Sequence, residues 1–286
     1  MVEEVRKYDT VSAFLDDCKT YLMRNECENN LILGICNRNL NVPIDPEKSI
    51  LVAAVNKSGT IISCAFTTSS KPALAVFIPQ LDDAIKPLVD YFIRHGIQLE
   101  GLNGKTDVVN TFLQHYSKPM IQSTKILLNV VKTLRNIELV QNSELELASM
   151  QDLSLLTTWI KNFQIDAGLL PLWSDEKIQA TTADRIQKKL VFVLVINDER
   201  QFVSMAAIVR ETDNLSFIGW VYTPPDLRNK GFASAVVYKL TDLILNTRQR
   251  HCALFTDEAN PTSNKIYRNI GYEPVAEYLD ICFSSS

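Results

Sequence analysis

The chain has 286 residues, more than a single domain usually holds, so two hydrophobic cores are expected. Hydrophobic residues make up 46% of the sequence and charged residues 22%, which is typical of globular proteins. The formal net charge of -4 provides no basic surface to neutralise a phosphate backbone, and this argues against nucleic acid as a partner.

The chain also lacks the usual marks of a membrane, metal or disulfide protein. Its start has no charged segment followed by an apolar run, and no stretch of about 18 apolar residues occurs later, so we expect a cytoplasmic protein with no membrane partner. The six cysteines form no CxxC pair and the three histidines are not grouped. Free thiols and no metal site are therefore expected.

Hydrophobic periodicity predicts helices, then strands, then alternating helices and strands in the first half of the chain. In chain order we expect helices at 11–24 and 29–40, strands at 49–56, 60–67 and 73–78, a helix at 81–94, a short strand after Gly96, a helix following 101–104 up to Tyr116, and a strand at 121–130.

The second half repeats this order, which suggests a duplication. We expect helices at 149–166 and 174–189, strands at 190–196, 201–210 and 214–223, and then helix, strand, helix and strand. The polar stretch 132–149 is predicted to contain the join, with 136–140 pairing across it as a strand. The predicted domains are residues 1–135 and 136–286. The fold class is α+β (α/β), with two tandem domains that each have a mixed, mostly antiparallel twisted sheet flanked by helices.

The segment SFIGWVYTPPDLRNKGFASAVVYKLTDLIL, residues 216–245, combines a strand, a turn and a helix. Pro224 and Pro225 end the strand, and apolar residues at helical spacing begin near Gly231 or Ala233. The first N–H groups of a helix lack partners within the helix and lie at its positive end, so they can bind an anion. Arg228 and Lys230 add positive charge to this turn. An ordinary turn with a solvated basic rim is the alternative explanation.

A second block, HCALFTDEANPTSNKIYRNIGYEPV at residues 251–275, predicts a short buried strand followed by a helix. Asn260 and Pro261 are typical of a helix start, and Gly271 is typical of a helix end. Tyr267 falls two turns into this helix.

Together the two blocks resemble the Gcn5-related N-acetyltransferase (GNAT) superfamily. Arg228, Gly231 and Ala233 match its Arg/Gln-x-x-Gly-x-Gly/Ala motif, and Asn260, Tyr267, Gly271 and Tyr272 match its closing motif. The resemblance covers about 148–283 at motif strength. In the first half it is weaker and rests on ENNLILGI at residues 28–35 and on the order of elements, which look like a bacterial tandem subgroup similar to FR47-like or glycine N-acyltransferase-like proteins with a degenerate first copy.

The resemblance implies an acyl-CoA-dependent N-acetyltransferase that uses acetyl-CoA and no metal. An amine of a small molecule or amino acid would attack the thioester directly, and Tyr267 would protonate the departing thiolate. A homodimer is left open. The implied cofactor-binding residues lie in the strand end, the turn, the helix start and the last helix: Val221, Tyr222, Thr223, Arg228, Asn229, Lys230, Gly231, Phe232, Ala233, Ser234, Asn260, Asn264 and Tyr267.

Several alternatives stay open at this point. Tyr267 could be a core or capping aromatic residue, and Trp173 and Trp220 are better explained as core than as an acceptor pocket. Glu211 and Asp257 are the nearest candidates for a general base, although each is more typical of a solvated loop. The whole chain could be a non-catalytic acyl-CoA-binding sensor. It could also be an aminoacyl-transferring enzyme with tandem halves, which its acidic balance does not support.

Overall fold

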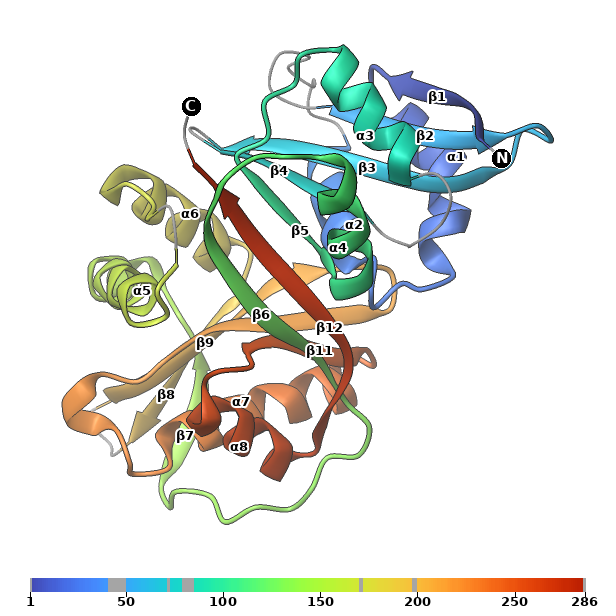
Figure 1. Ribbon diagram of the computed structural model, residues 1–286. Helices are drawn as coiled ribbons and strands as arrows, with labels where there is room; N and C mark the ends of the chain where they lie inside the picture. The colour runs from blue at the N-terminus through green and yellow to red at the C-terminus, as the bar shows by residue number, and fades with distance from the viewer. Residues whose placement is uncertain are drawn as a thin grey trace. The chain divides into compact units, whose positions relative to one another are not determined.

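The computed structural model describes residues 2–40, 50–70, 73–78, 85–169, 172–196 and 200–284. The chain divides into two compact units (Figure 1). The first unit comprises residues 1–128, 257–259 and 276–286, and the second comprises 129–256 and 260–275. The predicted domain boundary at 135/136 stays a prediction.

The first unit contains a strand, two helices, three strands, and then alternating helices and strands. Its elements are β1 (Val2–Tyr8), α1 (Val11–Met23), α2 (Asn30–Asn39), β2 (Ile50–Asn56), β3 (Ile61–Ser70), β4 (Ala73–Ile78), α3 (Ile85–Arg94), β5 (Gly101–Lys105) and α4 (Thr106–His115). Two long strands, β6 (Met120–Val131) and β12 (Tyr272–Phe283), contribute residues to both units.

The sheet of the first unit is mixed. Strands β1 to β4 pair antiparallel in chain order, β4 pairs parallel with β5, and β5 pairs antiparallel with residues 278–282 of β12. Alternate residues of β2 enter different cores, as the two-residue period of a strand requires. Val52 packs with α3 and α4, whereas Leu51 and Ala53 pack with α1 and α2.

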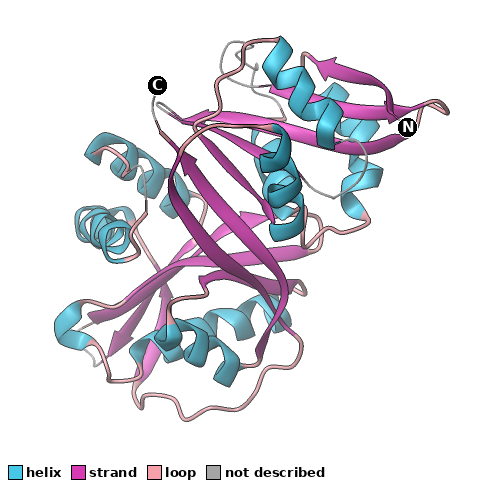
Figure 2. Cartoon of the chain, viewed as in Figure 1, coloured by secondary structure: helices cyan, strands magenta, loops and turns pink. Residues whose placement is uncertain are grey.

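The second unit repeats this order of elements. Figure 2 shows helices in cyan and strands in magenta for the whole described chain. The elements of the second unit are β7 (Ser143–Leu147), α5 (Leu153–Asp166), α6 (Asp175–Gln187), β8 (Val191–Ile196), β9 (Gln201–Glu211), β10 (Leu215–Tyr222), α7 (Phe232–Asp242), β11 (His251–Asp257) and α8 (Pro261–Ile270). Short 3₁₀ turns precede α5 and follow β10, and a π-helical turn at Leu243–Thr247 extends α7.

Helices cover both faces of this second sheet, in which β7 to β10 are antiparallel and β10 pairs parallel with β11. On one face, Val191 and Val193 of β8 pack in a core with α5 and α6. On the other face, Phe192 and Leu194 pack with α7. A short turn connects the carboxyl end of β10 to the amino end of α7, and the candidate site lies at this turn.

The fold class predicted from the sequence is confirmed, and so are most helices and strands. Three strands were missed or misplaced. β1 was not predicted, β5 begins at Gly101 rather than directly after Gly96, and β7 lies inside the stretch assigned to the join. The strand predicted at 136–140 is wrong, because these residues have no regular structure. The predictions for 41–49 and for the start of the helix at 81–84 lie outside the described residues.

Among the helices of the described ranges, none combines the length and the apolar character that crossing a lipid bilayer requires.

Candidate active site

The end of β10 carries a β-bulge. Its pairing with β9 passes from Gly219 opposite Ala207 directly to Tyr222 opposite Met205, and Trp220 has a left-handed φ of 52°. The bulge reverses which face the side chains occupy: Ile218 packs in the core with α7, whereas Trp220 and Tyr222 pack in the core with α5 and α6. A positive φ at a bulky residue is costly, and such positions are concentrated at functional sites.

Beyond the bulge, β10 and β11 separate. Their parallel pairs run from Leu215 opposite His251 to Ile218 opposite Leu254. None of the described residues of β11 pairs with residues 219–222, so this edge of β10 is left open to an extended ligand.

Aromatic and cationic side chains hold Trp220 in place. The rings of Trp173 and Trp220 are edge to face with centroids 6.4 Å apart, and the Arg185 guanidinium lies 4.9 Å from the Trp220 ring centroid. Arg185 also donates to the carbonyls of Ile208 at 2.9 Å and Val209 at 2.8 Å. The bulge is therefore a packed feature of the core, which fits the core interpretation of both tryptophans.

The turn after β10 leads into α7 through two left-handed residues. Asn229 has a φ of 62°, and Gly231 is the N-cap of α7 with a φ of 82°. The Ala235 N–H donates to the Gly231 carbonyl at 3.0 Å, so the N–H groups of Phe232, Ala233 and Ser234 come before the first hydrogen bond of the helix. These groups carry the positive end of the helix dipole.

The Arg228 side chain is held by protein groups. Its Nε donates to the Thr223 carbonyl at 3.0 Å, its Nη2 pairs with the Asp166 carboxylate at the end of α5, and its guanidinium lies 5.9 Å from the Tyr222 ring centroid. Lys230 turns back instead and donates to the Asp226 carbonyl at 3.1 Å.

Helix α8 begins and ends as the sequence predicts. The Asn260 side chain accepts from the Ser263 N–H at 3.1 Å, Pro261 occupies the first turn, and Gly271 closes the helix with a φ of 117°. The half-buried Tyr267 ring lies 6.0 Å from the Tyr272 ring in an edge-to-face contact. Burial raises the pKa of Tyr267 to about 12.

These elements surround one cavity of about 890 Å³ within the second unit. All of the predicted site residues line it except Lys230 and Asn264. The sequence interpretation missed the wall formed by Phe163, Asp166 and Ala167, because α5 lies about sixty residues earlier and carries only a helical period. Lys265 and Ile266 of α8 were missed as well.

Neither candidate base lines this cavity. The Glu211 carboxylate accepts from the Ser216 hydroxyl at 3.1 Å and lies 3.6 Å from Arg248, near the beginning of β10 rather than its end. Asp257 accepts from the Ala259 N–H at 2.8 Å and so stabilises the turn after β11. Within the part of the chain that the structure describes, no three His, Cys, Asp or Glu side chains gather as a metal-binding group.

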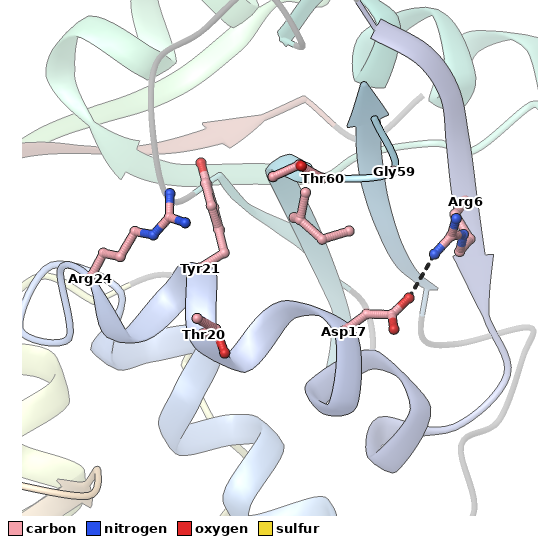
Figure 3. Close-up of a pocket in the computed structure, with 8 residues that line it drawn as sticks. Arg6, Asp17, Thr20, Tyr21, Arg24, Gly59 and Thr60 are labelled. Carbon is pink, nitrogen blue, oxygen red and sulfur yellow. Dashed lines mark hydrogen bonds and ion pairs between the residues drawn. The ribbon is translucent and has the colours of Figure 1, made fainter. Parts of the chain in front are cut away.

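The first unit has a smaller polar cavity of about 240 Å³ between β1, α1 and the turn between β2 and β3 (Figure 3). Arg6 points to Asp17 there, with a hydrogen bond of 2.8 Å, and also pairs with Glu4 at 2.8 Å. The charge of Arg6 is thus compensated by carboxylates, and the cavity has no helix N-terminus like that of α7 among its lining residues.

Comparisons with known proteins agree with this architecture. The model of the FR47-like protein family matches residues 194–280. Similar solved structures include an acetyltransferase of the GNAT family from Colwellia psychrerythraea, with 12% identity, coverage of 98% of this chain and 100% of that chain, and a TM-score of 0.59. A GCN5-related N-acetyltransferase from Sphaerobacter thermophilus has 15% identity, coverage of 98% and 95%, and a TM-score of 0.64.

A tandem GNAT protein from the clavulanic acid biosynthesis pathway is also similar, with 9% identity, coverage of 99% and 100%, and a TM-score of 0.58. At these identities the structures establish a shared fold. No curated protein matches the chain. The fold is that of the Gcn5-related N-acetyltransferases. Residues 194–280 match the FR47-like family, whose model covers part of the second unit.

Proposed function

We propose that the protein is an acyl-CoA-dependent N-acetyltransferase that transfers an acetyl group from acetyl-CoA to a primary amine of a small molecule or amino acid. The observation that carries this proposal is a single cavity that joins the open edge of β10 to the N-terminus of α7. This combination suits a carrier with an extended amide-containing arm and a diphosphate.

The residues divide into two binding functions. The N–H groups of Phe232, Ala233 and Ser234 bind the diphosphate at the positive end of α7, where the left-handed Gly231 lets the backbone turn. Residues 221–223 offer backbone groups to the pantetheine arm, as an open strand edge does for an added strand. The Tyr222 carbonyl accepts a hydrogen bond from the Ser204 hydroxyl of β9 at 3.0 Å, which holds the end of β10 in position.

The chemistry is one direct transfer. A bond forms between the amine nitrogen and the acetyl carbonyl carbon, the bond from that carbon to sulfur breaks, and the thiolate leaves with the electron pair. Tyr267 lines the cavity and donates its phenolic proton to the thiolate. The ammonium proton that the product must lose passes to water or to the acceptor's own carboxylate.

Two measurements test this function and separate it from a non-catalytic sensor. Calorimetry with acetyl-CoA reports binding, and release of free CoA thiol with a panel of primary amines reports turnover. We expect binding together with thiol release for at least one amine. Binding without thiol release for any amine supports the sensor, and absence of binding contradicts both functions.

A further inference from the structure

Asp166 places a negative charge in the cavity that is proposed to bind the diphosphate. It is the last residue of α5, and its carboxylate pairs with Nη2 of Arg228. Both side chains remain accessible, with exposed fractions of 45% for Asp166 and 44% for Arg228. The pair can therefore be broken without exposing a core.

As far as the structure describes the chain, the cavity is lined by two cationic side chains and one carboxylate, so its net charge is only +1. Among the described residues, the charged side chains that line it are those of Asp166, Arg228 and Lys265. Asp166 thus compensates one of two cations. Arg228 also donates Nε to the Thr223 carbonyl, so both of these hydrogen bonds go to protein groups.

A diphosphate that enters this cavity needs the positive charge that Asp166 already uses. A guanidinium binds phosphate and carboxylate oxygens with the same donors, so the two anions compete for Arg228. If the carboxylate stayed paired, it would also repel the incoming phosphates.

We infer that Asp166 is an affinity-determining residue that competes with the diphosphate for Arg228 and lowers the affinity for CoA. Arg228 exchanges Asp166 for phosphate oxygens when the ligand binds. This inference rests on the proposed function, because it assumes that the diphosphate occupies this cavity.

The test is calorimetric titration of CoA into the wild type, Asp166→Asn and the control Asp226→Asn. Asp226 lies on the turn beside Arg228, and its exposed side chain does not line the cavity, so this control removes the same charge nearby. Because an exposed ion pair contributes up to about 1 kcal/mol, we expect Asp166→Asn to bind CoA about two- to fivefold more tightly. Asp226→Asn should stay within about twofold of the wild type.

Two further titrations test whether the expected gain in CoA affinity comes from the competition for Arg228. Pantetheine, which lacks the diphosphate, should bind Asp166→Asn and the wild type equally. In an Arg228→Gln background, Asp166→Asn should give a clearly smaller gain in CoA affinity, because the competition for Arg228 is absent and only the direct repulsion is removed. Circular dichroism of each variant checks that it is folded.

The outcomes separate this inference from the proposed function. If the wild type binds CoA but Asp166→Asn binds it equally or more weakly, Asp166 only positions Arg228 and the inference is wrong. A full gain in the Arg228→Gln background also overturns it, because the carboxylate then acts by direct repulsion. If neither the wild type nor Asp166→Asn binds CoA, the proposed function fails together with the inference.

Discussion

At the scale of single residues, Gly231 is required for its backbone conformation. Its φ is 82°, and a Cβ built there would come no closer than 3.4 Å to the Val140 side chain, which is ordinary contact. A side chain at position 231 would meet no steric clash, but the left-handed backbone conformation disfavours a β-branched residue there. The turn that aims the first N–H groups of α7 therefore depends on this glycine.

Gly231→Val should reduce CoA affinity by more than about tenfold while the protein stays folded, because relaxing about 1–3 kcal/mol of backbone strain moves the turn. Gly59→Val is the matched control: Gly59 has a φ of 77°, a Cβ there meets nothing within 4 Å, and it lies in the first unit. Calorimetry should show unchanged CoA affinity for the control. Equal affinity of Gly231→Val and the wild type would remove this turn from the site.

Tyr267→Phe should lower kcat for acetyl transfer by about 10²-fold with little change in CoA affinity, because only the proton donor is lost. Tyr238→Phe makes the same chemical change on α7, where Tyr238 does not line the cavity. Its kcat should match the wild type. Steady-state thiol release measures both variants, and an unchanged rate for Tyr267→Phe would exclude it as the general acid.

The pH dependence of kcat follows from the raised pKa of Tyr267. An ordinary phenol is half ionised near pH 10, whereas burial moves the pKa of Tyr267 up to about 12. Its proton is lost only as the pH rises through this higher value, so kcat should not decline between about pH 8 and about pH 10 on account of Tyr267. An alkaline loss with an apparent pKa near 10 that disappears in Tyr267→Phe would contradict this prediction.

At the scale of elements, the β10 bulge depends on close approach of two strands. A Cβ at Gly219 would lie 2.8 Å from Cγ1 and 2.9 Å from Cγ2 of Val209 on β9. Both atoms are methyl carbons of a β-branched side chain, which is stiff at χ1, so rotation of Val209 does not easily relieve the clash. The close packing of β9 on β10 thus supports the conformation of the neighbouring Trp220.

Gly219→Ala should lower the free energy of unfolding by about 1–3 kcal/mol and reduce acetyl transfer, because β10 must shift. Val209→Ala removes both clashing carbons and should restore activity and much of the stability in the double variant. Chemical denaturation and thiol release provide the two measurements. If the double variant were no better than Gly219→Ala, the clash with Val209 would not be the cause.

Elements that depend on local signals were predictable, and elements that depend on partners were not. Helix α8 was predicted at both ends because Asn260, Pro261 and Gly271 act within one turn of the chain. The short strand expected directly after Gly96 begins only at Gly101, where parallel pairing of β5 with β4 and antiparallel pairing with β12 decide its position. Strand propensity depends on such tertiary neighbours more than helix propensity does.

At the scale of the whole molecule, the two units have separate cores but share strands. Each of β6 and β12 contributes residues to both units, so the chain passes between them more than once. All three tryptophans, Trp159, Trp173 and Trp220, belong to the second unit. Tryptophan fluorescence therefore reports unfolding of the second unit alone.

Leu88→Ala removes a fully buried side chain from the first unit and should lower the free energy of unfolding by about 2–5 kcal/mol. Because the shared strands connect the two units, we expect the tryptophan fluorescence transition in urea to shift together with the far-UV circular dichroism transition. A fluorescence midpoint that stays at the wild-type value would show that the units unfold independently.

The sequence by itself determined the fold class, the order of most elements and the strand, turn and helix that contain the candidate site. These features rest on local chemistry: Pro224 ends a strand, Gly231 adopts a left-handed turn, and apolar residues recur at helical spacing. Only the tertiary structure decided the bulge at Trp220, the wall of the cavity from α5 and the pairing of Arg228 with Asp166. These features join residues far apart in the chain, and no local pattern encodes which distant side chain will fill a given space.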